Sequence, residues 1–85
     1  MNLTELKEKL TKTGVREDFY SLSGGLPNDV FCINKTSRGW EVYYSERGLK
    51  SKIKTFSNED EACNYFYEFI ITDEVVINNL DIRNR

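Results

Sequence analysis

The chain has 85 residues, a formal net charge of −2 and no histidine. This length suits one domain over residues 1–85, with a thin hydrophobic core. Without histidine the chain lacks the commonest general base and the commonest zinc ligand, so we expect a protein that is not an enzyme and has no catalytic residues, metal site or cofactor.

The first predicted element is an amphipathic helix over residues 3–13. Asn2 is placed to cap it, and Glu5 follows three positions later as in a capping box. Gly14 is a typical residue just beyond a helix end. The apolar stripe of this helix consists of Leu3, Leu6 and Leu10. The pattern predicts a helix packed on the domain.

The N-terminal residues mix acids and bases and lack the apolar stretch of a secretory signal. No apolar run is long enough to cross a bilayer. We therefore expect a cytoplasmic protein without membrane contact. Cys32 and Cys63 are too few for a disulfide framework, and we expect both to be buried thiols.

Three strands are predicted over residues 30–35, 40–45 and 50–56, after a short strand over residues 19–22. Alternation would place Val30 and Cys32 on one face of the sheet and Phe31 and Ile33 on the other. In the next strand Trp40, Val42 and Tyr44 alternate with Glu41, Tyr43 and Ser45. Both connections end in Arg-Gly, which favours hairpin loops of three to five residues with Gly39 and Gly48 at positive φ.

A second helix is predicted from a Ser57 cap to a break near Thr72. Its apolar stripe would consist of Ala62, Phe66, Phe69 and Ile70. The opposite face would carry Asp60, Glu61, Asn64 and Glu68, with Tyr67 at its margin. Beyond the break we expect a short helix from about Asp73, with Val76 and Leu80 packed inward.

This order predicts an α+β domain, α-β-β-β-α plus a C-terminal extension. The strands would form an antiparallel three- to four-stranded meander with helices packed on one face. The other face of the sheet would be polar and aromatic. An exposed Tyr43 between Glu41 and Ser45 would be a reasonable anchor for a partner.

Lys50, Lys52 and Lys54 occupy alternate positions, which predicts a row of ammonium groups on one face of a strand. The element order is also that of the double-stranded-RNA-binding domain, in which the start of the last helix contacts phosphate. Here that helix begins with Glu59-Asp60-Glu61, which would repel phosphate. We interpret the lysines as a solvated face that discourages edge-to-edge aggregation.

Charge is unevenly distributed. Residues 1–56 carry ten Lys/Arg against seven Asp/Glu, net +3, and residues 57–85 carry two against seven, net −5. An alternative interpretation is therefore a small nucleic-acid-binding module. It would use Arg38, Arg47, Lys50, Lys52 and Lys54.

Residues 21–66 contain Gly-Trp-Glu-Val-Tyr-Tyr-Ser-Glu-Arg-Gly followed by Phe-x-x-Glu-x-x-Ala-Cys. This stretch resembles a small immunity-protein family of bacterial polymorphic toxin systems. The resemblance implies a non-catalytic cytoplasmic inhibitor that binds and neutralises the C-terminal domain of a cognate toxin, often a nuclease. It supplies no agreed binding residues, and the toxin and the oligomeric state stay open.

Toxins that act on nucleic acid are basic, and an acidic surface speeds association with a basic partner. We therefore predict that partner binding involves the acidic face of the second helix, together with the exposed tyrosine of the sheet. The predicted contact residues are Asp60, Glu61, Tyr67, Glu68 and Tyr43.

Overall fold

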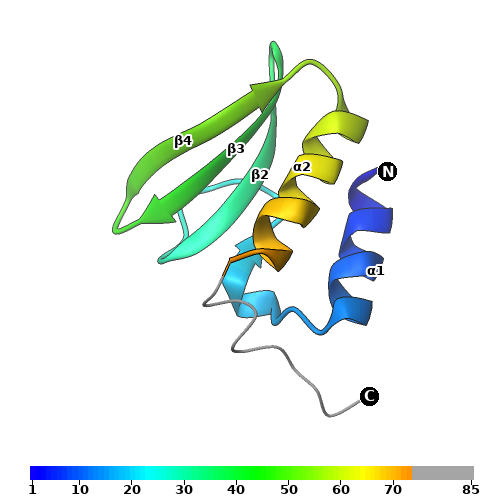
Figure 1. The fold of residues 1–85 in the computed structure, drawn as a ribbon. Helices are drawn as coiled ribbons and strands as arrows, with labels where there is room; N and C mark the ends of the chain where they lie inside the picture. Colours follow the sequence, from blue (N-terminus) through cyan, green and yellow to red (C-terminus); the bar gives the residue numbers. More distant parts are fainter. Residues whose placement is uncertain (74–85) are drawn as a thin grey trace.

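A computed structural model describes residues 1–73 and confirms the predicted α+β class (Figure 1). The elements in chain order are α1 (Leu3–Thr13), a 3₁₀ turn (Glu17–Phe19), β1 (Tyr20–Ser21), β2 (Val30–Thr36), β3 (Gly39–Glu46), β4 (Leu49–Phe56) and α2 (Glu59–Ile71). The predicted short C-terminal helix, with Val76 and Leu80, lies outside the described residues. No helix within residues 1–73 is long and apolar enough to span a membrane.

The four strands form one sheet in the order β1-β2-β3-β4. The β2–β3 and β3–β4 pairs are antiparallel, as predicted, but β1 runs parallel to β2. The prediction of a wholly antiparallel sheet is therefore wrong at β1. Residues 22–29 carry the chain from the end of β1 back to the start of β2, so both strands point the same way.

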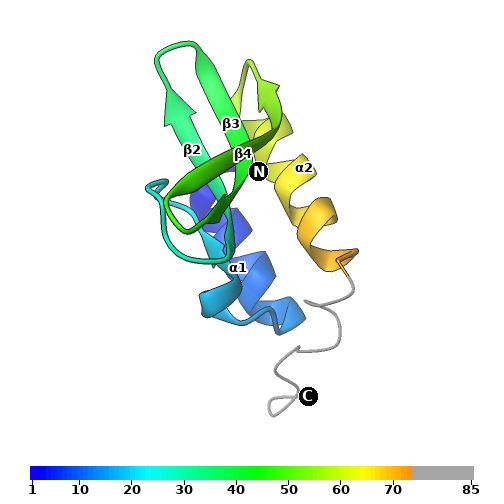
Figure 2. The same cartoon turned by 90° about the vertical axis from the view of Figure 1, so that its left-hand side faces the viewer.

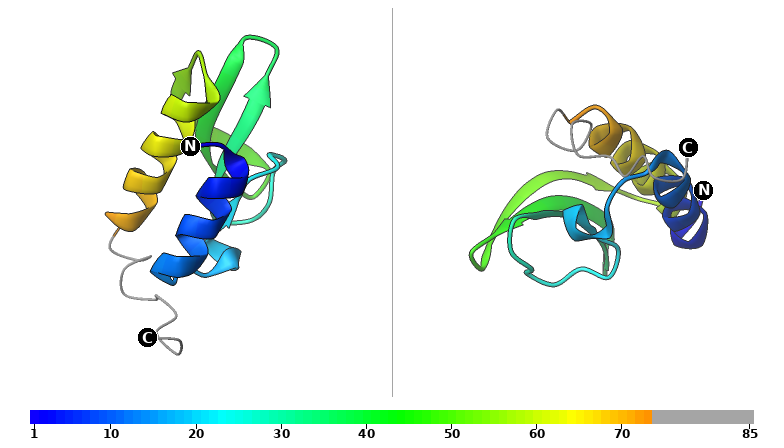
Figure 3. Two further views of the ribbon diagram at one scale, coloured as in Figure 1. Left: turned by 90° about the vertical axis from the view of Figure 1, so that its right-hand side faces the viewer. Right: turned by 90° about the horizontal axis from the view of Figure 1, so that it is seen from below.

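Both helices lie on one side of the sheet, as predicted (Figures 1 and 3). Helix α2 packs against β2, β3 and β4, and α1 packs beside α2. The main core lies between these layers. Its fully buried members include Leu6, Leu10, Ile33, Val42, Phe66 and Ile70. The predicted alternation of β2 and β3 is confirmed, because Ile33 and Val42 face this core while Cys32 and Tyr43 form a second cluster with Val30.

Figure 2 looks onto the face of the sheet away from the helices. Residues 22–29 cross one end of this face (Figure 3, right), where they are hydrogen-bonded to Ser45 and to Tyr43 of the second cluster. The Ser45 hydroxyl donates to the Pro27 carbonyl oxygen at 2.6 Å, and the Tyr43 hydroxyl donates to the Gly25 carbonyl oxygen at 2.6 Å. This end of the polar and aromatic face is therefore covered by the chain itself.

Both hairpin loops have two residues, so the prediction of three to five is wrong. Thr36 pairs with Gly39, and Glu46 pairs with Leu49. In the second loop Arg47 and Gly48 have φ of 50° and 79°, which matches the type I′ turn that suits the twist of a hairpin.

A β-bulge in β4 breaks the predicted row of lysines. Val42 pairs with Lys54 and Tyr43 pairs with Lys52, so Ile53 is an extra residue on β4. Lys50 and Lys52 stay on the face away from the helices. Lys54 instead turns to the helix side, where its Nζ lies 5.3 Å from the ring centre of Tyr65. The prediction that all three lysines share one face is therefore wrong.

The helix ends are set by local hydrogen bonds. The predicted capping box of α1 is confirmed, because the Asn2 side chain accepts from the Glu5 N–H and Glu5 accepts from the Asn2 N–H. In α2 the cap is Asn58, not Ser57 as predicted, because the Asn58 side chain accepts from the Glu61 N–H at 2.8 Å. The predicted end of α2 near Thr72 is confirmed.

Candidate functional site

The outer face of α2 carries two exposed carboxylates, Glu61 and Glu68. Their spacing is close to two helical turns, so they share one face of the helix with exposed Asn64 between them. Neither carboxylate forms a hydrogen bond or ion pair with another side chain of residues 1–73. The structure therefore brings two of the predicted contact residues together and leaves both available to a partner.

Asp60 and its neighbour Glu59 are engaged within the fold. The Asp60 carboxylate pairs with the α-amino group of Met1, and Glu59 accepts from the Leu3 N–H at 2.9 Å. The hydrogen bond from Met1 lowers the pKa of the Asp60 carboxyl below its ordinary value. Asp60 therefore lies on the α1 side of α2 and helps to hold the two helices together.

Tyr67 also lies on the α1 side, and it is half-buried. Its hydroxyl shares a hydrogen bond of 2.7 Å with the Thr13 hydroxyl, and the Nζ of Lys9 lies 4.6 Å from its ring centre. The structure thus separates Tyr67 from the face that carries Glu61 and Glu68. Asp60 borders that face, because its carboxylate also accepts from the Asn64 side chain at 3.4 Å.

Tyr43 faces away from the helices, as predicted, but the prediction that it is exposed is wrong. The residue is only 2 % exposed, because residues 22–29 cover it. The Nζ of Lys50 lies 4.6 Å from its ring centre. Burial raises the pKa of the Tyr43 phenol to about 12. Tyr43 can therefore contact no partner while this segment stays in place.

A row of aromatic rings, which the sequence did not predict, lies along the junction of α2 and the sheet. Successive ring centres are 5.2, 5.9, 5.1 and 5.0 Å apart. We call this row the aromatic strip, and it consists of Phe56, Tyr65, Phe69, Phe31 and Tyr44. All five side chains are half-buried. The strip is a partly exposed apolar surface that borders the carboxylates of α2.

The sequence pattern predicted that Phe69 lies on the apolar stripe of the second helix and indicated no role for Tyr65. One local signal was present, since Tyr65 and Phe69 are four residues apart on α2 and must be neighbours there. The other rings come from β2, β3 and β4. Their union with α2 depends on tertiary packing, which a single sequence does not reveal.

The basic residues of the alternative interpretation are distributed over different parts of the surface. Lys50 pairs with Glu41, whose side chain is 7 % exposed, and Lys54 lies on the helix side of the sheet. Arg38 and Arg47 lie in different hairpin turns. The five residues therefore do not share one face, although Arg38 and Lys52 line the same cleft.

The described residues offer no cluster of three or more His, Cys, Asp or Glu that could hold a metal ion. Cys32 and Cys63 are buried free thiols, as predicted. Burial raises the pKa of the Cys63 thiol to about 11 and that of the Cys32 thiol above its ordinary value. Both cysteines are therefore neutral thiols at neutral pH.

Comparison of the chain with models of protein families, with curated proteins and with solved structures gave no match.

Proposed function

We propose that this protein is a non-catalytic immunity protein, which binds and neutralises a cognate bacterial toxin domain in the cytoplasm of the producing cell. The observation that carries the proposal is the aromatic strip beside Glu61 and Glu68, whose carboxylates have no partner within residues 1–73. The resemblance of residues 21–66 to immunity proteins supports the same function.

This surface has the composition of a protein-binding site. Aromatic side chains are enriched at the centres of protein interfaces, whereas charged groups gather at the rim. Here the rings of the aromatic strip would form the apolar centre, and Glu61 and Glu68 would form one rim. A partner that fits would place an apolar patch against the strip and basic side chains opposite the two carboxylates.

The rings of the strip are also held in position before any partner binds. Tyr65 packs against Phe56 on one side and Phe69 on the other, with ring centres 5.2 and 5.9 Å away. The ammonium group of Lys54 lies within 5.5 Å of the Phe56 and Tyr65 ring centres. Side chains that are already ordered lose less conformational entropy on binding, so this packing favours affinity.

Binding to the product of a neighbouring toxin gene tests the proposal. Co-expression of the two genes should give a complex that co-purifies, and the protein should protect cells from the toxin domain. Tyr65→Ala should weaken the complex by about 2 kcal/mol, as expected for an aromatic interface anchor. The matched control is Leu26→Ala, because Leu26 is 52 % exposed but lies in the segment that covers the other face. Circular dichroism verifies that both variants fold.

If Tyr65→Ala and Leu26→Ala weaken the complex equally, the aromatic strip is not part of the interface. If no complex forms at micromolar concentration and the toxin kills cells that express the protein, the immunity function itself is wrong.

The separation of the basic residues favours this proposal over the nucleic-acid-binding alternative. Affinity for nucleic acid comes mainly from several cations that neutralise phosphates along one surface. Lys50 is paired with Glu41, and Lys54 lies on the opposite face from Lys52. A nucleic-acid strand could therefore contact only some of the five predicted basic residues at one time.

A further inference from the structure

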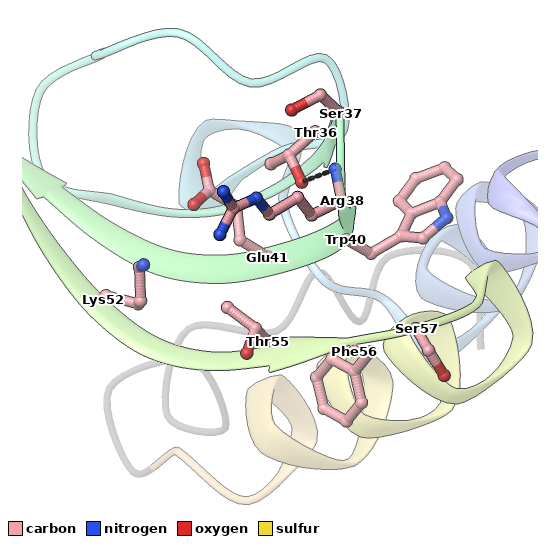
Figure 4. Close-up of a pocket in the computed structure, with 9 residues that line it drawn as sticks. All are labelled: Thr36, Ser37, Arg38, Trp40, Glu41, Lys52, Thr55, Phe56 and Ser57. Carbon is pink, nitrogen blue, oxygen red and sulfur yellow. Dashed lines mark hydrogen bonds between the residues drawn. The ribbon is translucent and has the colours of Figure 1, made fainter.

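The end of the outer sheet face that residues 22–29 leave open contains a cleft of about 540 Å³. We call it the concave cleft (Figure 4). Its polar lining includes Thr36, Ser37, Arg38, Glu41, Lys52 and Thr55. Trp40, Phe56 and Ser57 also line the cleft, and the rings of Trp40 and Phe56 turn away from its polar side chains in Figure 4, in keeping with the strand alternation. The volume lies within the range of sites for small ligands.

The concave cleft carries a net positive charge. Arg38 and Lys52 are exposed, and neither side chain has a hydrogen bond or ion pair within residues 1–73. Glu41 is the third charged residue of the lining, and it pairs with Lys50, which lies outside the lining. Two cations are therefore left for an anion, and guanidinium and ammonium groups both bind phosphate well.

The cleft also offers acceptors to a ligand that has hydroxyl groups. Lys50 bonds to the Oε1 atom of Glu41, whereas Oε2 has no hydrogen-bond partner within residues 1–73. The Glu41 side chain is fixed, because it is only 7 % exposed and is held by Lys50. The Ser37 and Thr55 hydroxyls line the same cleft and can donate or accept.

We propose that the concave cleft binds a sugar phosphate. Arg38 and Lys52 would contact the phosphate, and Glu41 and Thr55 would accept hydrogen bonds from hydroxyl groups of the sugar. This chemistry has two sources, a free sugar phosphate and a ribose-phosphate unit of single-stranded RNA. The polar side chains of the cleft lie on the opposite face of the sheet from the aromatic strip, and the two sites share only Phe56, so the proposal does not depend on the proposed immunity function.

Titration of the whole chain with ribose 5-phosphate, followed by amide chemical shifts and calorimetry, tests the proposal. Saturable binding is expected, tighter than that of inorganic phosphate or ribose alone. Arg38→Gln and Lys52→Gln should each weaken binding about tenfold, because each removes a charge-assisted hydrogen bond. The matched controls are Arg47→Gln and Lys54→Gln, since Arg47 lies in the other hairpin turn and Lys54 on the helix side.

A second titration with a short RNA strand separates the two sources. If RNA binds no more tightly than ribose 5-phosphate, the ligand is a free sugar phosphate. If RNA binds more tightly and its binding still needs Arg38 and Lys52, the ligand is a ribose-phosphate unit of RNA. The proposal is overturned if ribose 5-phosphate does not saturate the protein. It is also overturned if Lys54→Gln weakens binding as much as Lys52→Gln, or if inorganic phosphate binds as tightly as ribose 5-phosphate.

Discussion

The ionisation of Tyr43 is coupled to folding. Its phenol pKa is raised from the ordinary value of 10.0 to about 12 because burial disfavours the charged phenolate. The folded state therefore holds this proton more tightly than the unfolded state does. The resulting stability is fully present below pH 10 and is lost as the pH rises from about 10 to about 12.

Replacing Tyr43 with phenylalanine should remove this part of the alkaline loss of stability, whereas the part from the buried Cys63 thiol, whose pKa is raised to about 11, should stay. The variant also loses the hydrogen bond to the Gly25 carbonyl oxygen, which should lower the free energy of unfolding at neutral pH by about 1 kcal/mol. Urea unfolding at a series of pH values measures both effects. Tyr65→Phe is the control, because the Tyr65 hydroxyl has no hydrogen bond within residues 1–73. An equal alkaline loss in Tyr43→Phe would show that another group is responsible.

At the scale of the helix, the start of α2 depends on Asn58. Its side chain accepts from the Glu61 N–H, which would otherwise lack an intrahelical partner. Asn58→Ala should lower the free energy of unfolding by about 1 kcal/mol. Ser57→Ala is the matched control and should change it little, because the Ser57 side chain makes no hydrogen bond within residues 1–73. If thermal or urea unfolding showed that Ser57→Ala lowers the free energy of unfolding more than Asn58→Ala does, Ser57 would be the cap instead.

At the scale of neighbouring strands, Gly39 at the start of β3 allows β3 and β4 to approach closely. A Cβ added there would lie 2.3 Å from the Phe56 carbonyl oxygen, and the φ of Gly39 is 139°. Gly48 also has a positive φ, of 79°, but an added Cβ there would have no atom within 4 Å. Gly48→Ala should therefore cost about 1 kcal/mol, from backbone strain alone.

Gly39→Ala should cost several times as much as Gly48→Ala, about 3 kcal/mol or more, because backbone must move as well. Urea unfolding of the two variants gives the comparison. Equal costs would mean that β3 and β4 can separate at this point without loss.

Several features that the sequence predicted correctly are set by neighbouring residues. The capping box of α1 and the alternation of β2 depend on residues a few positions apart, and both are confirmed. The bulge at Ile53 and the parallel pairing of β1 depend on partners far along the chain. A strict period of two cannot reveal a bulge, so Lys54 was assigned to the wrong face.

At the scale of the whole molecule, one part of the candidate site could be predicted from the sequence and another part could not. Glu61 and Glu68 could be predicted to share a face, because one helix carries both. The aromatic strip could not be predicted, because its rings come from three strands and a helix. The burial of Tyr43 could not be predicted either, since it depends on the path of residues 22–29 across the sheet.

The acidic face of α2 should act on a basic toxin partner over a distance, before the surfaces touch. Charge reversal of Glu61 and Glu68 together to lysine should therefore slow association about tenfold at low salt, with a smaller effect on dissociation. Glu8→Lys is the control, because Glu8 is an exposed carboxylate on α1. Stopped-flow mixing with the co-purified partner at several salt concentrations measures the rates. The difference between variant and parent should shrink as the salt concentration rises, since ions screen exposed charges beyond about 10 Å at 0.1 M. An association rate that the double reversal leaves unchanged at low salt would exclude the carboxylates from steering, while the aromatic strip could still bind.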